Sequence, residues 1–286
     1  MVRRVVAAGV DPLEALRLAT LNPADYFGLR DRGAIAPGRR ADLVITSDLR
    51  TLPVERVYAG GRLAARDGVP EPWRVPVAAE LPPSMRVTLS REMFRIPARG
   101  GLARVIGVVE NQIVTLSGET EPTVEEGLVV ADPGRDLLKI AVLERHGGSG
   151  RVGLGLVQGM GLREGAMAGT VAHDHHNIIV VGVDDASMLT AARAVTDMGG
   201  GLAVAVGEAV RATLALPIGG LMSGRPIEEV RRAFDEVVAA ARSLGSPLHD
   251  PFMAMSFLGL EVIPSLKLTD QGLVDVDAFR PVDLWV

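Results

Sequence analysis

A run of prolines constrains the fold of this chain more than any other feature of its sequence. Five of them fall between residues 69 and 84, namely Pro70, Pro72, Pro76, Pro82 and Pro83. Proline fixes φ and removes a backbone donor, so it disfavours both a helix and a central strand. Domain boundaries occur in segments of this kind. We therefore expect two structural regions that meet across residues 69–84.

The composition is typical of a soluble globular protein with room for two domains. Of the 286 residues, 48% are hydrophobic and 23% are charged. The net charge of -5 comes from 30 basic and 35 acidic residues without blocks of one sign. No basic stripe is therefore present to neutralise a phosphate backbone, and we expect no nucleic acid partner.

The sequence contains no cysteine. This excludes disulfides, thiolate-bound zinc and a thiol nucleophile, and it fits a reducing compartment. The apolar stretch at the amino terminus ends after six residues at Asp11-Pro12, which is too short for a signal peptide. Later apolar runs, such as Ile178 to Val183, have the length of strands. We expect a cytoplasmic protein that does not span a membrane.

The first region begins with a short amphipathic helix. Asp11 is suited to cap it and Pro12 to occupy its first position, and Asn22-Pro23 is expected to end it. Its apolar face consists of Leu13, Leu16, Leu18 and Leu21. A helix of about ten residues is unstable alone in water, so this face requires a packing partner.

Small β elements follow that helix. We expect a turn at Ala36-Pro37-Gly38, a strand from Asp42 to Thr46, and a hairpin from Val54 to Ala64 that closes at Gly60-Gly61.

The second region alternates strands and helices, which predicts a mixed α/β domain. The glycines of "LERHGGSGRVGLG" (143–155) are typical of a hairpin, because a phosphate-binding loop needs a nearby lysine and a following helix. "PIGGLMSG" (217–224) is expected to be a loop that shapes a pocket or turns the chain. The expected strands are 137–143, 151–158, 178–183, 202–206 and 209–216; the expected helices are 186–198, one from after Ser223 to near Gly245, and one capped by Asp250.

Three of the five histidines lie in "GTVAHDHHNIIVVG" (169–182). If this segment is extended, His173, His175 and Asn177 share one face and Asp174 and His176 share the other. Two imidazoles can bind one divalent ion, but a zinc site needs at least three protein ligands. Additional ligands would have to come from Glu144, His146 or His249. The alternative is the polar end of an ordinary strand.

Two parts of the sequence resemble known families. "GVDPLEALRLATLNPADYFGLRDRGAIAPGRRADLVI" (9–45) resembles the carboxyl-terminal end of an amidohydrolase-superfamily enzyme. "GTVAHDHHNIIVVG", "LPIGGLMS" and "DPFMAMSFLGLEVIPSLKLTDQGLVDV" resemble the extra carboxyl-terminal domain of bacterial adenine deaminase. The resemblance implies three parts: a remnant of the last barrel helix (1–28), a small β-sandwich or composite domain (29–75), and a carboxyl-terminal α/β domain with a mixed sheet (76–286).

The family resemblance implies a purine aminohydrolase that converts adenine and water to hypoxanthine and ammonia in purine salvage. A binuclear manganese or iron centre supplies the attacking hydroxide in that family, because a bound divalent ion lowers the pKa of its water. The metal ligands of the family lie in the barrel, so none can be assigned to a residue of this chain. The implied partner is an amidohydrolase barrel, in the same parent chain or in a separate polypeptide, and we expect the chain alone to be inactive.

The family signature has a serine where this sequence has His175. We hypothesise that His173, Asp174, His176 and Asn177 form a polar patch at the mouth of the barrel, where it orders the purine or excludes solvent. His175 belongs to the same candidate patch. Glu144 and His146 are secondary candidates.

Two other interpretations remain. The chain can be a standalone binding or regulatory module without chemistry, or an independent metallo-hydrolase based on the histidine cluster. An orphaned first helix and a divided β domain also predict exposed apolar surface, and therefore a homo-oligomer.

Overall fold

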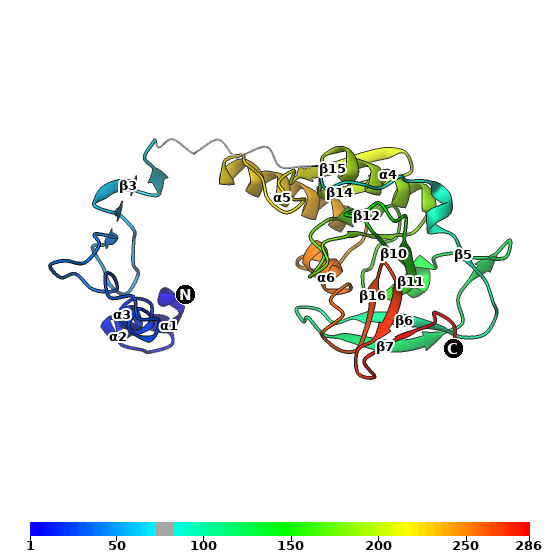
Figure 1. Ribbon diagram of the computed structural model, residues 1–286, viewed down its shortest axis with the longest axis horizontal. Helices are drawn as coiled ribbons and strands as arrows, with labels where there is room; N and C mark the ends of the chain where they lie inside the picture. The colour runs from blue at the N-terminus through cyan, green and yellow to red at the C-terminus, as the bar shows by residue number, and fades with distance from the viewer. Residues whose placement is uncertain (73–82) are drawn as a thin grey trace. The chain divides into compact units, whose positions relative to one another are not determined.

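The computed structural model describes residues 1–72 and 83–286 (Figure 1). The chain divides into two compact units, Met1–Val77 and Ala78–Val286. The predicted boundary between residues 75 and 76 lies outside the described residues, as do Pro76 and Pro82. Pro70, Pro72 and Pro83 lie within them. The division into three parts stays a prediction.

The amino-terminal unit contains three short helices and one antiparallel sheet. Asp11 caps α2 as expected, since its Oδ1 accepts from the backbone N of Leu13 at 2.9 Å. The expected turn at Ala36 and the hairpin at Gly60-Gly61 are present. The elements are α1 (Val2–Ala7), α2 (Pro12–Leu18), α3 (Leu21–Tyr26), β1 (Leu43–Ile45), β2 (Arg56–Ala59), β3 (Arg62–Arg66) and β4 (Val69–Pro70), with the sheet in the order β1-β2-β3-β4.

The prediction that Asn22-Pro23 ends the first helix is wrong. The helix α2 ends at Leu18, and Pro23 lies in the first turn of α3. Proline is tolerated there because the first backbone N–H groups of a helix have no partner within the helix.

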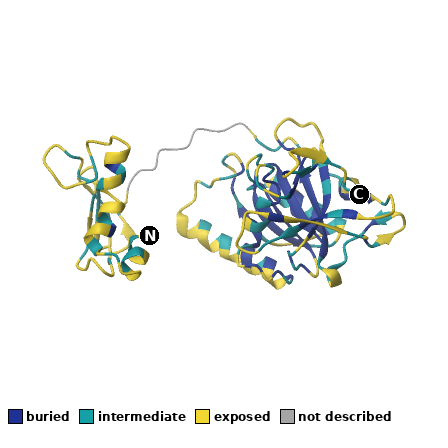
Figure 2. Ribbon diagram, turned by 90° about the horizontal axis from the view of Figure 1, so that it is seen from below, coloured by how far each residue is buried: buried dark blue, intermediate teal, exposed yellow. Residues whose placement is uncertain are grey.

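The amino-terminal unit buries little apolar surface of its own. Among its hydrophobic side chains Ala15 and Ala24 are buried, whereas Leu13, Tyr26 and Ile35 are 61%, 84% and 88% exposed. Figure 2 shows this unit mostly in the colours of exposed and half-buried residues. The exposed apolar surface expected from an orphaned helix is therefore present.

The carboxyl-terminal unit is built on an eight-stranded mixed sheet. Its strand order is β15-β14-β12-β13-β10-β11-β6-β7, in which β11 and β6 are parallel and the other neighbours antiparallel. The strands are β6 (Ala103–Val108), β7 (Thr115–Thr120), β10 (Leu137–Leu143), β11 (Val152–Gln158), β12 (Ala166–Gly169), β13 (Ile178–Gly182), β14 (Gly201–Val206) and β15 (Ala209–Ala215).

Smaller elements complete this unit. Two three-stranded sheets have the orders β16-β17-β18 and β5-β9-β8. The helices are α4 (Asp185–Asp197), α5 (Ile227–Ser243) and α6 (Pro251–Phe257), with the 3-10 turns η1 (Arg91–Phe94) and η2 (Pro133–Arg135); the strands are β5 (Ile96–Pro97), β8 (Val124–Glu125), β9 (Leu128–Val129), β16 (Leu266–Thr269), β17 (Gly272–Asp275) and β18 (Arg280–Val282). The mixed α/β fold class, and each strand and helix expected in this region, are thus confirmed within a few residues.

The central strands of the large sheet are buried on both faces, which is why they are almost continuously apolar (Figure 2). Alternate residues of β13 point to opposite layers: Ile179 belongs to the core cluster that includes side chains of α5, α6 and β16, whereas Ile178 belongs to the cluster that includes side chains of α4 and η1. The central strands β10, β12 and β13 are buried along their whole length. Apart from Lys139 of β10, which forms an ion pair, the charged side chains near these strands lie in the loops at the strand ends.

Two lysines are buried within this unit. Lys139 of β10 forms an ion pair with Asp185 at the start of α4. Lys267 of β16 donates to the backbone oxygens of Ile113 and Phe257, each at 2.9 Å, and so joins the β6–β7 connection to the end of α6. Burial lowers the pKa of Lys267 to about 8.

Among the described residues, no helix is long and apolar enough to cross a membrane.

Glycines allow β11 to approach the small β16–β17 sheet closely. A Cβ added to Gly153 would lie 1.8 Å from the backbone oxygen of Thr269. A Cβ added to Gly155 would meet its nearest neighbour, Cγ2 of Ile140, at 3.4 Å.

We predict that Gly153→Ala destabilises the carboxyl-terminal unit by about 3 kcal/mol, because the backbone oxygen of Thr269 cannot move away without a shift of the strand. Gly155→Ala is the matched control, and equal denaturant midpoints for the two variants would contradict the prediction.

Candidate functional site

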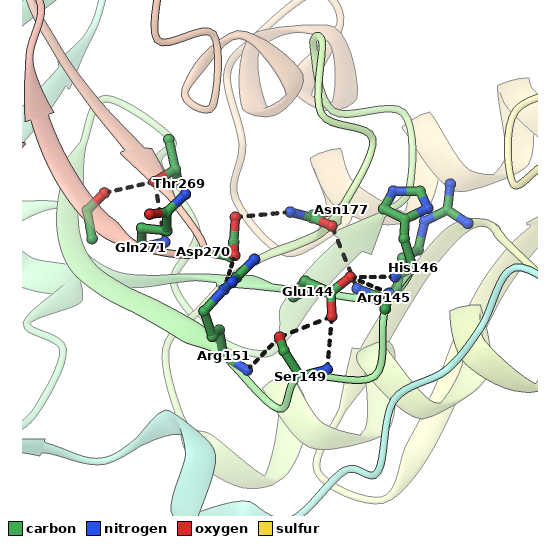
Figure 3. A network of polar contacts seen from close by, with 11 residues as sticks. Glu144, Arg145, His146, Ser149, Arg151, Asn177, Thr269, Asp270 and Gln271 are labelled. Atoms are coloured by element: carbon green, nitrogen blue, oxygen red, sulfur yellow. Dashed lines mark hydrogen bonds and ion pairs between the residues drawn. The ribbon is translucent and has the colours of Figure 1, made fainter.

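Two hairpin loops at one end of the large sheet form the candidate site. Loop 144–151 joins β10 to β11, and loop 170–177 joins β12 to β13. Because β10 and β13 are neighbours, with Leu143 opposite Ile178, the two loops emerge side by side. The structure therefore brings the secondary candidates Glu144 and His146 together with the histidine-rich segment, as Figure 3 shows for the first loop and Asn177.

The prediction that residues 173–177 alternate between two faces is wrong. The segment turns instead: the backbone N of His176 donates to the oxygen of Ala172 at 2.7 Å, and His176 has a φ of 52°. A connection between paired strands must reverse the chain, so it cannot keep the period-two pattern of a strand. Sequence neighbours in this loop therefore have different environments.

Glu144 orders the first loop around its carboxylate. One oxygen accepts from the backbone N of His146 and of Gly147, both at 2.6 Å, and the other accepts from the backbone N and the Oγ of Ser149, both at 2.9 Å (Figure 3). Burial by itself raises the pKa of Glu144, but these four hydrogen bonds outweigh it and lower that pKa to about 2. Glu144 is thus an ionised anchor of the loop.

Asn177 and Asp270 connect the histidine loop to β16. The buried amide of Asn177 donates to Oδ1 of Asp270 at 3.2 Å, and its oxygen accepts from the backbone N of Arg145 at 3.4 Å. The other oxygen of Asp270 accepts from Nε of Arg151 at 2.7 Å. This network, drawn in Figure 3, spans three segments of the chain and makes Asn177 part of the framework.

The environment of His175 and His176 lowers the pKa of both side chains and so favours their neutral forms. Burial lowers the pKa of His175, against the opposing effect of Glu261 and Asp270. Burial also lowers the pKa of His176, followed by repulsion from His173 and Arg145. Nδ1 of His175 accepts from the backbone N of Asn177 at 3.1 Å. Within residues 1–72 and 83–286, the buried Nε2 of His175 and Nδ1 of His176 have no hydrogen-bond partner.

His173, Asp174 and His146 occupy the outer side of the site. The carboxylate of Asp174 is 81% exposed, and its Oδ1 lies 3.8 Å from Nδ1 of His173. The His173 ring stacks on Phe257 of α6, with ring centroids 4.9 Å apart. Nε2 of His146 lies 3.0 Å from the backbone oxygen of His175. These groups and the half-buried rings of His175 and His176 can contact a molecule outside the unit.

The loops do not converge on a metal-binding arrangement. Across the part of the chain that the structure describes, no group of three or more histidine, aspartate or glutamate side chains is placed to hold a metal ion. His249, one of the ligands considered from the sequence, lies outside this network, at a small cleft of about 190 Å³ beside α6. The residues present therefore do not fit the binuclear metal centre of the amidohydrolase superfamily.

The sequence reasoning missed two residues that shape the site, Thr170 and Asp270. Oγ1 of Thr170 donates to the backbone oxygen of Gly220 at 2.6 Å and accepts from the backbone N of Gly201 at 2.8 Å. Asp270 lies 93 positions from Asn177 in the sequence. No local sequence pattern predicts a contact between residues so far apart in the chain.

Comparison with known proteins places the chain in a family. The model of the adenine deaminase C-terminal domain matches residues 112–280, and that of the amidohydrolase family matches residues 1–64. The chain belongs to the adenine deaminase family. A curated relative named adenine deaminase from Desulfatibacillum aliphaticivorans is 51% identical over 287 residues, which is 100% of this chain and 50% of the relative.

Two further relatives of the same name agree with this assignment. Those from Methanothrix thermoacetophila and Oleidesulfovibrio alaskensis are each 49% identical over 100% of this chain and 50% of their own length. The chain therefore spans about half the length of the curated relatives it matches, and it corresponds to their carboxyl-terminal half.

The Glu144 anchor gives the protein a defined acid sensitivity. The folded-state pKa of about 2 lies below the ordinary value of 4.5, so this carboxylate stabilises the fold above pH 4.5 and loses that contribution as the pH falls towards 2. We predict that Glu144→Gln lowers the free energy of unfolding by about 2 kcal/mol at pH 7, because an amide cannot accept all four hydrogen bonds.

The measurement for Glu144 is urea unfolding between pH 7 and pH 3. The difference between wild type and Glu144→Gln should shrink as the pH falls below 4.5. Glu119→Gln, on the exposed part of β7, is the matched control. A difference that stays constant with pH would contradict the anchoring role.

Proposed function

We propose that this chain forms the carboxyl-terminal half of an adenine aminohydrolase, which converts adenine and water to hypoxanthine and ammonia. The observation that carries the proposal is the 51% identity to a curated adenine deaminase along the whole of this chain. The enzyme would act in purine salvage in the cytoplasm. The absence of cysteine from the sequence fits this reducing compartment.

In this proposal the metal pair, manganese or iron, is bound by an amidohydrolase barrel that belongs to the same parent chain or to a separate polypeptide. The metal would supply a hydroxide for attack on the purine carbon that bears the amino group. The apolar surface of the amino-terminal unit supports a barrel partner. A groove of about 940 Å³ in that unit is lined by residues that include Leu16, Phe27 and Ile35. The same surface supports a homo-oligomer.

The role that we propose for the polar patch is to order the purine or to close off solvent at the mouth of the barrel. A neutral imidazole offers one donor and one acceptor, and a purine presents ring nitrogens and an amino group. Burial lowers the pKa of His175 and of His176, which favours neutral imidazoles, and the carboxylate of Asp174 is exposed; both features are compatible with that task. Exclusion of water would strengthen each of these contacts.

A chimera tests the proposed activity directly. The amino-terminal half of the Desulfatibacillum aliphaticivorans relative would be joined to this chain, and ammonia release from adenine would be measured with manganese present. We predict enzyme-like turnover by the chimera and none by this chain alone. Turnover by this chain alone would refute the need for a barrel. A folded, metal-loaded and inactive chimera would favour a binding or regulatory module.

Histidine variants of the chimera test the patch. His173→Ala and His176→Ala should each lower kcat about tenfold or more, because the substrate or the closing surface is misplaced. Metal content, measured by elemental analysis, should not change, since the patch does not ligate the metals. His249→Ala is the matched control. Loss of thermal stability without a separate kinetic effect would show that the loop is purely structural.

A further inference from the structure

Arg145 is a buried cation at the centre of the candidate site. It follows β10, and its residue exposure is 0%. In the described ranges, no carboxylate lies within ion-pair distance of its guanidinium. A buried charge without such a partner is costly unless other polar groups solvate it. Its hydrogen bonds therefore identify the groups that compensate the buried charge.

The guanidinium donates to three segments that are distant in the sequence. Nε donates to the backbone oxygen of His176 at 2.5 Å, and Nη2 donates to that of Gly219 at 2.9 Å. Nη1 donates to the backbone oxygen of Ser84 at 3.0 Å and to its Oγ at 2.8 Å. One side chain thus joins the histidine loop, loop 217–224 and the beginning of the described part of the carboxyl-terminal unit.

Loop 217–224 packs directly on this guanidinium. A Cβ added to Gly220 would lie 2.7 Å from Nη2 of Arg145, so only glycine allows this approach. Gly220 also has a φ of 78°, which favours glycine. Its backbone oxygen accepts from Thr170 at 2.6 Å, at the other end of the histidine loop. The two loops are therefore joined twice, through Arg145 and through Thr170.

The geometry of these contacts requires arginine in particular. The planar guanidinium carries five donors in a fixed arrangement, which lets one group meet acceptors in several directions. A lysine offers three donors at one atom, and an apolar residue would leave the buried backbone oxygens without partners.

We infer that Arg145 is the positioning residue of this site: its buried guanidinium fixes loop 170–177 and loop 217–224 in one arrangement and thereby presents His173, Asp174 and His176 for the reaction. This inference rests on the proposed function for its last step. The joint fixation of the two loops does not depend on that function, and it is tested on this chain alone.

Hydrogen exchange of the full 286-residue chain tests the fixation. In Arg145→Met and Arg145→Lys, backbone amides of both loops, including those of His176 and Met222, should exchange at least about tenfold faster than in wild type. Arg231→Met is the matched control, because Arg231 lies on the exposed face of α5 and pairs with Asp235. Exchange of either loop at the wild-type rate in Arg145→Met would overturn the inference.

A histidine titration by NMR separates the charge of Arg145 from its hydrogen bonds. The charged groups that act on His176 are His173, Arg145, Asp174 and His146. Arg145→Met should raise the pKa of His176, because it removes a positive charge that lowers it. Arg145→Lys should leave that pKa low while the loops loosen. An unchanged pKa of His176 in Arg145→Met would show that the guanidinium does not act on this ring.

Kinetics of the chimera test the last step. Arg145→Met and Arg145→Lys should lower kcat about tenfold or more, whereas Arg231→Met should not. If both loops loosen and kcat is unchanged, the positioning role in the reaction is refuted. If the unsubstituted chimera is inactive, the proposed function fails, and hydrogen exchange and NMR still decide whether Arg145 fixes the loops.

Discussion

Burial of both faces of the central strands of the eight-stranded sheet governs the rest of the carboxyl-terminal unit. Strands β10, β12 and β13 have no solvent-facing side, so their side chains contribute packing and almost no chemistry. Each polar group at their ends must then be solvated by other parts of the protein. This requirement explains why loops from distant parts of the sequence are tied together by hydrogen bonds at that end of the sheet.

Two anchors of opposite charge satisfy this requirement in different ways. Glu144 collects donors from its own loop and so makes that hairpin rigid. Arg145, the next residue, collects backbone oxygens from other loops. Two neighbouring residues after β10 thus stabilise two separate structures.

The sequence predicted the elements of the fold better than the contacts of the site. Apolar runs and caps placed β10, α4 and α5 within a few residues because these signals are local. The tight turn within 173–177 was missed because the pattern of polar residues there resembles an alternating strand. Thr170 and Asp270 were missed because their partners are distant in the sequence. Long-range hydrogen bonds leave no periodic signal in a single sequence.

The two units differ in how their cores are built. The carboxyl-terminal unit contains a continuous core on each side of its sheet, whereas the amino-terminal unit buries two alanines and exposes larger apolar side chains. Hydrophobic burial is the main source of folding free energy, so the first unit gains far less from its own packing. Its helices and small sheet therefore leave large apolar side chains exposed to solvent.

The placement of the lysines gives the folded protein an unusual chemical property. The sequence contains two lysines, Lys139 and Lys267, and both side chains are buried. The positive charge of the surface is therefore carried by arginine, whose guanidinium does not react with acylating reagents under mild conditions. Acylation at the lysines would report opening of the sheet and of the contacts around α6.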